Sequence, residues 1–251
     1  MFRVESAVQI DAAGVHYRDL NARLRDAVED GAERIELHNV FGQRYIGTDL
    51  HRPVEIHIYG TPGNDLAAFM DGPRLVVHGN VQDGCGNTMN GGEVIIHGRA
   101  GDVTGYSMRG GKIFVRDDVG YRVGIHMKEY QGQCPTIVIG GTAQHFLGEY
   151  MAGGVLVVLG LTLQPGQQHV AEFIGTGMHG GVMYIRGELE EYQLGREVGQ
   201  VPLDDEDRAL LGELMGEYCT HFGFEAHEVF SQPFTKLIPL SSRPYGRLYA
   251  Y

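Results

Sequence analysis

A methionine that returns at a fixed interval constrains this chain more than any other feature. Six methionines follow one another at spacings of 19, 19, 19, 24 and 27 residues: Met70, Met89, Met108, Met127, Met151 and Met178. A period near 20 residues is typical of solenoids, in which each repeat forms one coil stacked on the previous coil. The two longer intervals indicate loops inserted into otherwise regular coils.

Glycines and a short aliphatic run accompany each methionine. The motif Gly-x-x-Met-x-Gly-Gly occurs at 86–92, 105–111, 148–154 and 175–181. The aliphatic runs are EIHIYG (55–60), LVVHG (75–79), VIIHG (94–98), IFVRD (113–117), IVIG (137–140), LVVLG (156–160) and MYIRG (183–187). Parallel strands are joined almost always by right-handed crossovers. We therefore predict an all-β fold, a right-handed parallel β-helix of about seven coils with helical flanks at both ends.

The regular repeat divides the chain into three predicted regions. Residues 1–52 form an α/β cap, with a helix from Tyr17 to Asp30 and a strand at 34–40. Residues 53–187 form the parallel β-helix. Residues 188–251 hold a second helix, from Pro202 to about Tyr218, and an extended tail over 234–251. Solenoids need atypical ends to cover their terminal coils, and the two flanks are the candidates for this role.

Side-chain parity within the runs separates a core face from an outer face. The first and third positions of each run are always apolar, as in Leu75 and Val77, and should point into the core because side chains alternate along a strand. The six methionines should form a second inward column, since an unbranched side chain adapts to small irregularities of a narrow core. We therefore predict a structural ladder of buried methionines.

The second position of each run should point outward, yet it is apolar in six of the seven runs. These six residues are Val76, Ile95, Phe114, Val138, Val157 and Tyr184, which we call the outer stripe. Exposed apolar patches of this extent usually mark a contact. The outer stripe is therefore a candidate docking surface for partner subunits, and the alternative is that the chain's own tail or N-terminal helix covers it.

Composition excludes several classes of protein and partner. The net charge of −12 argues against a nucleic-acid partner, which would require a clustered basic face. The longest apolar stretch, residues 155–163, is too short to span a bilayer. Three widely spaced cysteines provide neither a disulfide framework nor a four-cysteine metal site. The first residues carry charges where a signal peptide needs an apolar run, so we expect a cytoplasmic protein.

Candidate catalytic residues are weak on sequence grounds. The twelve histidines show no metal-binding spacing, and His78 and His97 are expected on the outer face. The glycine-rich corner at 84–92 does not open a helix after a strand, as phosphate-binding motifs require. Cys85 has no identifiable base nearby, and Asp117-Asp118 lies at a corner where Asp is a common turn residue. We therefore predict no catalytic, cofactor-binding or metal-binding residues in this chain.

The repeats resemble the GXGXG domain, the C-terminal β-helix of glutamate synthase large subunits. They also resemble the subunit of formylmethanofuran dehydrogenase that has the same repeats, and residues 101–133 are similar to both. The segment 233–249 is similar to the end of glutamate synthase, where a helix leads into a Phe-x-Lys-x-x-Pro segment, here Phe234, Lys236 and Pro239. The family has an Asp beside its Arg-containing turn, whereas this chain has Ser at 241 and 242.

The resemblance implies a scaffold whose chemistry lies in other subunits. The family's glutaminase uses an N-terminal cysteine, whereas this chain begins Met1-Phe2, and its synthase region holds FMN and an iron–sulfur cluster. We therefore expect a non-catalytic subunit that organises separate glutaminase-type and FMN-binding synthase subunits. These partners would carry the FMN and the iron–sulfur cluster and convert glutamine and 2-oxoglutarate to glutamate. The alternatives are a scaffold of formylmethanofuran dehydrogenase or of N-methylglutamate synthase, and an independent β-helix enzyme.

Overall fold

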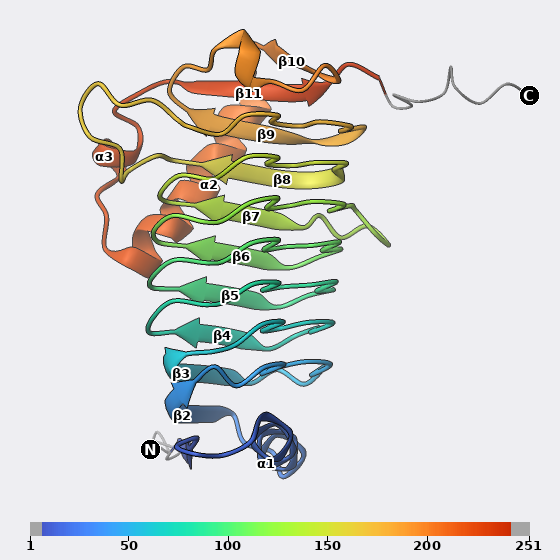
Figure 1. The fold of residues 1–251 in the computed structure, drawn as a ribbon, viewed down its shortest axis with the longest axis vertical. Helices are drawn as coiled ribbons and strands as arrows, with labels where there is room; N and C mark the ends of the chain where they lie inside the picture. The colour runs from blue at the N-terminus through green and yellow to red at the C-terminus, as the bar shows by residue number, and fades with distance from the viewer. Residues whose placement is uncertain (1–6, 242–251) are drawn as a thin grey trace, which may run out of the picture.

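A single 11-stranded sheet runs the length of the computed structural model, which describes residues 7–241 (Figure 1). Its parallel strands are β1 (Val8–Asp11), β2 (Arg34–Phe41), β3 (Glu55–Thr61), β4 (Arg74–Val77), β5 (Glu93–Ile96), β6 (Lys112–Val115), β7 (Thr136–Ile139), β8 (Ala152–Val158) and β9 (Gly180–Arg186). Each strand pairs in parallel with the next one along the chain. The protein is therefore a parallel β-solenoid, as the methionine period predicts.

The register repeats from coil to coil. Leu75 pairs with Val94, and Val94 pairs with Ile113, so equivalent positions of successive runs stack directly. Strands β3 to β9, which correspond to the seven aliphatic runs, are separated by six crossovers, and the solenoid has about six turns. The prediction of about seven coils is therefore not confirmed, although each of the seven predicted runs forms a strand.

The sheet does not begin at residue 53, where the sequence placed the start of the β-helix. Strands β1 and β2 extend the same parallel sheet, and their Ile10, Ile35 and Leu37 belong to the same hydrophobic core as the later coils. Helix α1 (Tyr17–Glu29) covers the N-terminal end of this core with Leu20 and Leu24 (Figure 1). The N-terminal region is thus an extension of the solenoid with a helical cover.

Two antiparallel strand pairings close the C-terminal end of the sheet. Strand β11 (Phe234–Pro239) pairs antiparallel with β9, and β10 (Val198–Val201) pairs antiparallel with β11. The remaining elements are the short 3-10 helix η1 (Glu191–Gln193), helix α2 (Asp205–Phe222) and helix α3 (Ala226–Val229). Pairing with β11 satisfies the edge of β9, which would otherwise offer unpaired backbone groups. The predicted tail continues beyond the described residues from 242 onward.

The repeat motif has a packing explanation. All six ladder methionines are 0% exposed. Gly111, the last glycine of its motif, has φ +79°, and a Cβ on it would lie 2.6 Å from the Cε atom of Met89 in the preceding coil. Gly181 has φ +82° and the same relation to Met151. The glycine therefore supplies both the left-handed backbone and the space that the methionine methyl group of the previous coil fills.

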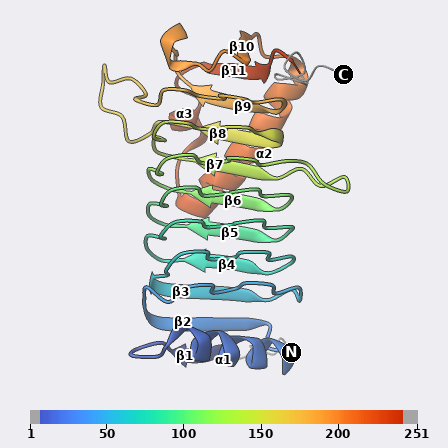
Figure 2. The same cartoon turned by 45° about the vertical axis from the view of Figure 1, so that its right-hand side comes forward.

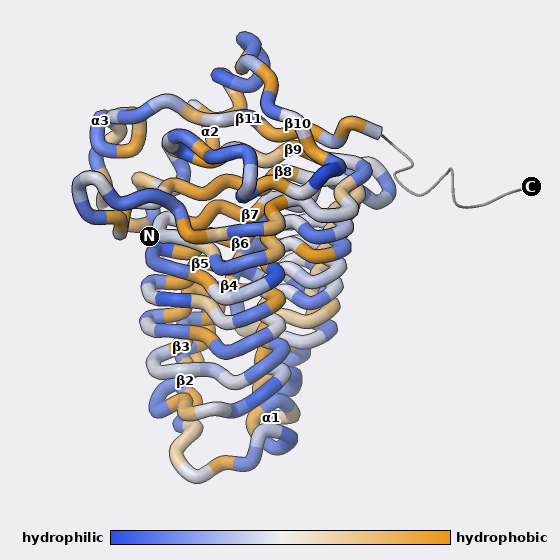
Figure 3. Tube along the Cα trace, turned by 45° about the horizontal axis from the view of Figure 1, so that its top comes forward, coloured by the Kyte–Doolittle hydropathy of each residue, from blue (hydrophilic) through white to orange (hydrophobic). Residues whose placement is uncertain are grey.

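Strand side chains follow the predicted parity. First and third positions such as Leu75 and Val77 lie in the interior cluster, and the stacked apolar segments are visible from coil to coil in Figure 3. The six residues of the outer stripe belong to a separate cluster on the other face of the sheet. The sheet therefore has two apolar layers, one inside the solenoid and one outside it.

Candidate functional site

The outer stripe is covered by the chain's own helix α2. Helix α2 runs obliquely across the outside of the upper coils, behind the sheet in Figure 1 and beside it in Figure 2. The outer stripe forms one buried cluster with the helix residues Leu211, Leu214, Met215 and Tyr218. Phe114 and Val138 are 0% exposed. The outer stripe is therefore not free to dock a partner subunit, as the sequence had suggested. Its six residues instead pack in one cluster with helix α2 of the same chain.

The covering element also differs from the two that the sequence suggested. Helix α1 lies at the N-terminal end of the core, and the described tail forms strand β11 at the other end. Helix α2, which follows β10 in the chain, instead turns its apolar residues to the sheet. The apolar composition of the outer stripe predicted that something would cover it, but only the tertiary structure shows that helix α2 does so.

The N-terminal end of α2 is fastened by a buried carboxylate. Asp207 accepts hydrogen bonds from the Tyr184 hydroxyl at 2.5 Å and from Lys236 Nζ at 2.6 Å. Burial alone would raise the pKa of Asp207, but the hydrogen bonds from Lys236 and Tyr184 prevail and lower it to about 2. Lys236, the central residue of the Phe-x-Lys-x-x-Pro segment, thus ties β11 to α2. Asp207 was not singled out from the sequence, although it lies in the acidic first turn of the predicted helix.

The C-terminal half of α2 is held by a network of charges. Lys112 Nζ lies 2.6 Å from Glu217 Oε1, and Arg74 bridges Glu55 and Glu93 at 2.7 Å each. Ligand atoms of Glu93, Glu217 and His221 all lie within 4.8 Å of one another, a spacing that could hold a cation. However, Lys112 and Arg74 already neutralise the two glutamates. We read this cluster as an ion-pair network that fastens the helix to β5 and β6.

Histidines on the outer face stack instead of converging. The ring centroids of Tyr59 and His78 are 4.5 Å apart, those of His78 and His97 are 5.4 Å apart, and the His97 ring meets Phe222 edge-on. The pKa values of His78 and His97 are lowered, first by burial and then by neighbouring positive groups. These rings therefore extend the contact between the sheet and the end of α2 in their neutral form.

Corner carboxylates join successive coils. Asp83 Oδ1 accepts the backbone N–H of Asp102 at 2.9 Å, and Asp102 Oδ1 accepts that of Tyr121 at 2.8 Å. Asp118 repeats the contact with the backbone N–H of Thr142 at 2.8 Å. The Asp118 carboxylate therefore binds the next coil rather than its own turn. These carboxylates satisfy backbone donors at a corner and are not arranged as a general acid and base.

The cysteine thiols are poor nucleophiles. Cys85 is fully buried, and burial raises its pKa to about 12. Burial also raises the pKa of Cys134 and of Cys219. A thiol reacts as the thiolate, so none of the three is poised to react near neutral pH.

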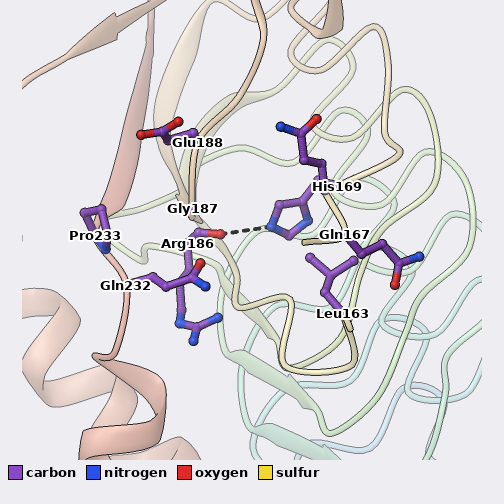
Figure 4. A pocket seen from close by; sticks show the side chains of 9 residues that line it. Leu163, Gln167, His169, Arg186, Gly187, Glu188, Gln232 and Pro233 are labelled. Atoms are coloured by element: carbon purple, nitrogen blue, oxygen red, sulfur yellow. Dashed lines mark hydrogen bonds between the residues drawn. The ribbon is translucent and has the colours of Figure 1, made fainter. Parts of the chain in front are cut away.

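A cavity of about 290 Å³ lies where the regular coils end (Figure 4). It is lined by Leu163, Gln167, Gln168, His169, Arg186, Gly187, Glu188, Gln232 and Pro233. His169 comes from the loop after β8, Arg186 is the last residue of β9, and Gln232 precedes β11. His169 Nε2 donates to the backbone oxygen of Arg186 at 2.9 Å, the dashed line in Figure 4. Sequence reasoning missed this cavity, and its one signal was the 27-residue interval between Met151 and Met178.

Comparison with known proteins places this architecture in a family. The family described as "GXGXG motif" matches residues 32–239, which spans the solenoid and its C-terminal closure. The chain belongs to the GXGXG motif family. It is also 48% identical, over 250 residues, to the uncharacterized protein MJ1350 of Methanocaldococcus jannaschii, with 96% of each chain covered. Within residues 7–241, no helix combines the length and apolar character needed to cross a membrane.

Proposed function

We propose that this GXGXG chain is a non-catalytic scaffold subunit of a glutamate synthase-type amidotransferase–oxidoreductase that works in the cytoplasm. It would hold separate glutaminase-type and FMN-binding synthase subunits that pass ammonia from glutamine to 2-oxoglutarate and form glutamate. The family match over residues 32–239 is the observation that carries this proposal. The contact of Lys236 with Asp207 supports the proposal, because it gives the Phe-x-Lys-x-x-Pro segment shared with glutamate synthase a structural role, the attachment of α2 to β11.

The chemistry of the described residues fits a scaffold better than an enzyme. The carboxylates at the corners bind backbone N–H groups, the histidines stack, and the thiols have raised pKa values. The proposal therefore assigns FMN and the iron–sulfur cluster to the partner subunits. An isolated chain purified under anaerobic conditions should show neither flavin absorbance nor iron–sulfur absorbance. Stoichiometric absorbance of either kind would contradict the assignment.

The decisive experiment is purification of the tagged full-length chain from its native source, with co-eluting chains identified by mass spectrometry. Co-elution of a glutaminase and an FMN synthase, with glutamine-dependent formation of glutamate, is the expected result. Formation of N-methylglutamate would favour an N-methylglutamate synthase, and a molybdopterin subunit would favour a formylmethanofuran dehydrogenase. Activity of the chain alone would support an independent β-helix enzyme and refute the scaffold.

A further inference from the structure

The cavity beside Arg186 exists because the repeat is broken at this coil. The interval from Met151 to Met178 is 27 residues, eight longer than the regular 19. The additional length forms the loop between β8 and β9, which brings His169 to the wall of the cavity beside the backbone of Arg186 (Figure 4). The loop is held in place, since Thr162 Oγ1 donates to Asp118 at 2.6 Å and Gln193 Nε2 donates to the backbone oxygen of His169 at 2.7 Å.

Arg186 carries a buried positive charge without a carboxylate partner. Its residue is 9% exposed. It donates to the backbone oxygen of Leu159 at 2.9 Å, to Ser231 Oγ at 2.7 Å and to the backbone oxygen of Glu228 at 3.3 Å, and all three acceptors are neutral. Over residues 7–241, no carboxylate forms an ion pair with it, and its Nε atom is buried without a hydrogen-bond partner.

This arrangement is costly for a purely structural arginine. A guanidinium has five N–H donors, and the three acceptors around Arg186 leave two of them unused. A buried charge is normally paired, because removing it from water without a counter-charge is strongly unfavourable. Linking β8, β9 and the end of α3 through carbonyl groups would not by itself require a full positive charge. The positive charge without a counter-charge indicates an anionic occupant.

The rest of the cavity wall fits a small oxyanion. Figure 4 shows Gln232 beside the Arg186 side chain, where its amide can supply a further N–H donor, and Leu163 and Pro233 supply apolar walls. The volume of about 290 Å³ is at the small end of the range for ligand pockets. Glu188 also lines the cavity and is exposed. Its negative charge opposes an anion and should weaken binding.

We propose that this cavity binds a small oxyanion, a carboxylate or a phosphate, with the Arg186 guanidinium as its counter-charge. This inference does not depend on the proposed scaffold function, because it concerns only residues of this chain. A carboxylate and a phosphate both present negatively charged oxygens to the guanidinium, and both can accept two parallel hydrogen bonds from an arginine. The two can be separated by titration.

The test uses the full chain titrated with sodium acetate or sodium phosphate, against sodium chloride at matched ionic strength, with the thermal midpoint and calorimetry as readouts. The expected result is a saturable rise of the midpoint, with a heat of binding, for at least one oxyanion and not for chloride. A response to acetate alone identifies a carboxylate site, and a response to phosphate alone identifies a phosphate site. No saturable response to either oxyanion overturns the proposal.

Two variants show whether the response comes from this cavity. Arg186→Gln should abolish it. Because this substitution could also unfold the chain, Glu188→Gln provides a second test on an exposed side chain. Removing the opposing charge should make the oxyanion bind several-fold more tightly without changing the midpoint in chloride. An affinity that is the same in wild type and in Glu188→Gln, or that survives in folded Arg186→Gln, overturns the assignment to this site.

Discussion

The contact between α2 and the outer stripe makes a sharp prediction at Phe114. This side chain is 0% exposed and lies between the sheet and the helix, with the His221 ring centroid 4.8 Å from its own. In Phe114→Ala, the transfer free energy of the ring is lost and a cavity is left behind. Such truncations cost about 3–5 kcal/mol of unfolding free energy. If the stripe were exposed and awaiting a partner, the same change would be within about 0.5 kcal/mol of wild type.

Phe41→Ala is the matched control for this prediction. Phe41 is the last residue of β2 and is 90% exposed, so the same substitution there removes no buried contact. Urea unfolding followed by far-UV circular dichroism should show a large loss for Phe114→Ala and almost none for Phe41→Ala. Limited proteolysis should also cut Phe114→Ala faster in the connection between β10 and α2, at residues 202–204. Equal unfolding curves for the two variants would refute the covering role of α2.

Three further predictions concern the repeat and the anchor of α2. Gly111→Ala should cost more unfolding free energy than Gly132→Ala. Both glycines have φ +79°, but only at Gly111 does the new Cβ meet neighbouring atoms. Equal losses for the two variants would show that backbone strain alone matters. Met108→Asp should prevent folding because it buries an unpaired charge. Met108→Leu should lower the unfolding free energy by less than about 1.5 kcal/mol. A soluble, cooperatively melting Met108→Asp chain would contradict the inward ladder of methionines. Asp207 has its pKa lowered to about 2 in the folded chain, so its stabilising contribution is present above its unfolded pKa near 3.9 and is lost as the pH falls toward 2. Asp207→Asn should therefore reduce stability at pH 7 and flatten the dependence between about pH 4 and 2, and an unchanged acid profile would refute the anchor.

The repeating part of the fold could be predicted because its contacts are local. Each coil touches the coils before and after it, about 19 residues away, so one period in the sequence carries the strand positions, the parity and the methionine ladder. The positions of Leu75 and Val77 follow from alternation along a strand, and the buried Met89 follows from its spacing.

The tertiary structure alone decided what covers the outer stripe and where a cavity forms. Lys112 and Glu217 are 105 residues apart in sequence, and the Tyr218 hydroxyl donates to the Arg116 carbonyl oxygen across 102 residues. No period links such positions. Hydrophobic burial has no direction, so an apolar stripe shows that it needs a cover but not which segment supplies it. The Arg186 cavity was equally hidden, because it arises where a loop that breaks the repeat meets a segment that returns from the far end of the chain.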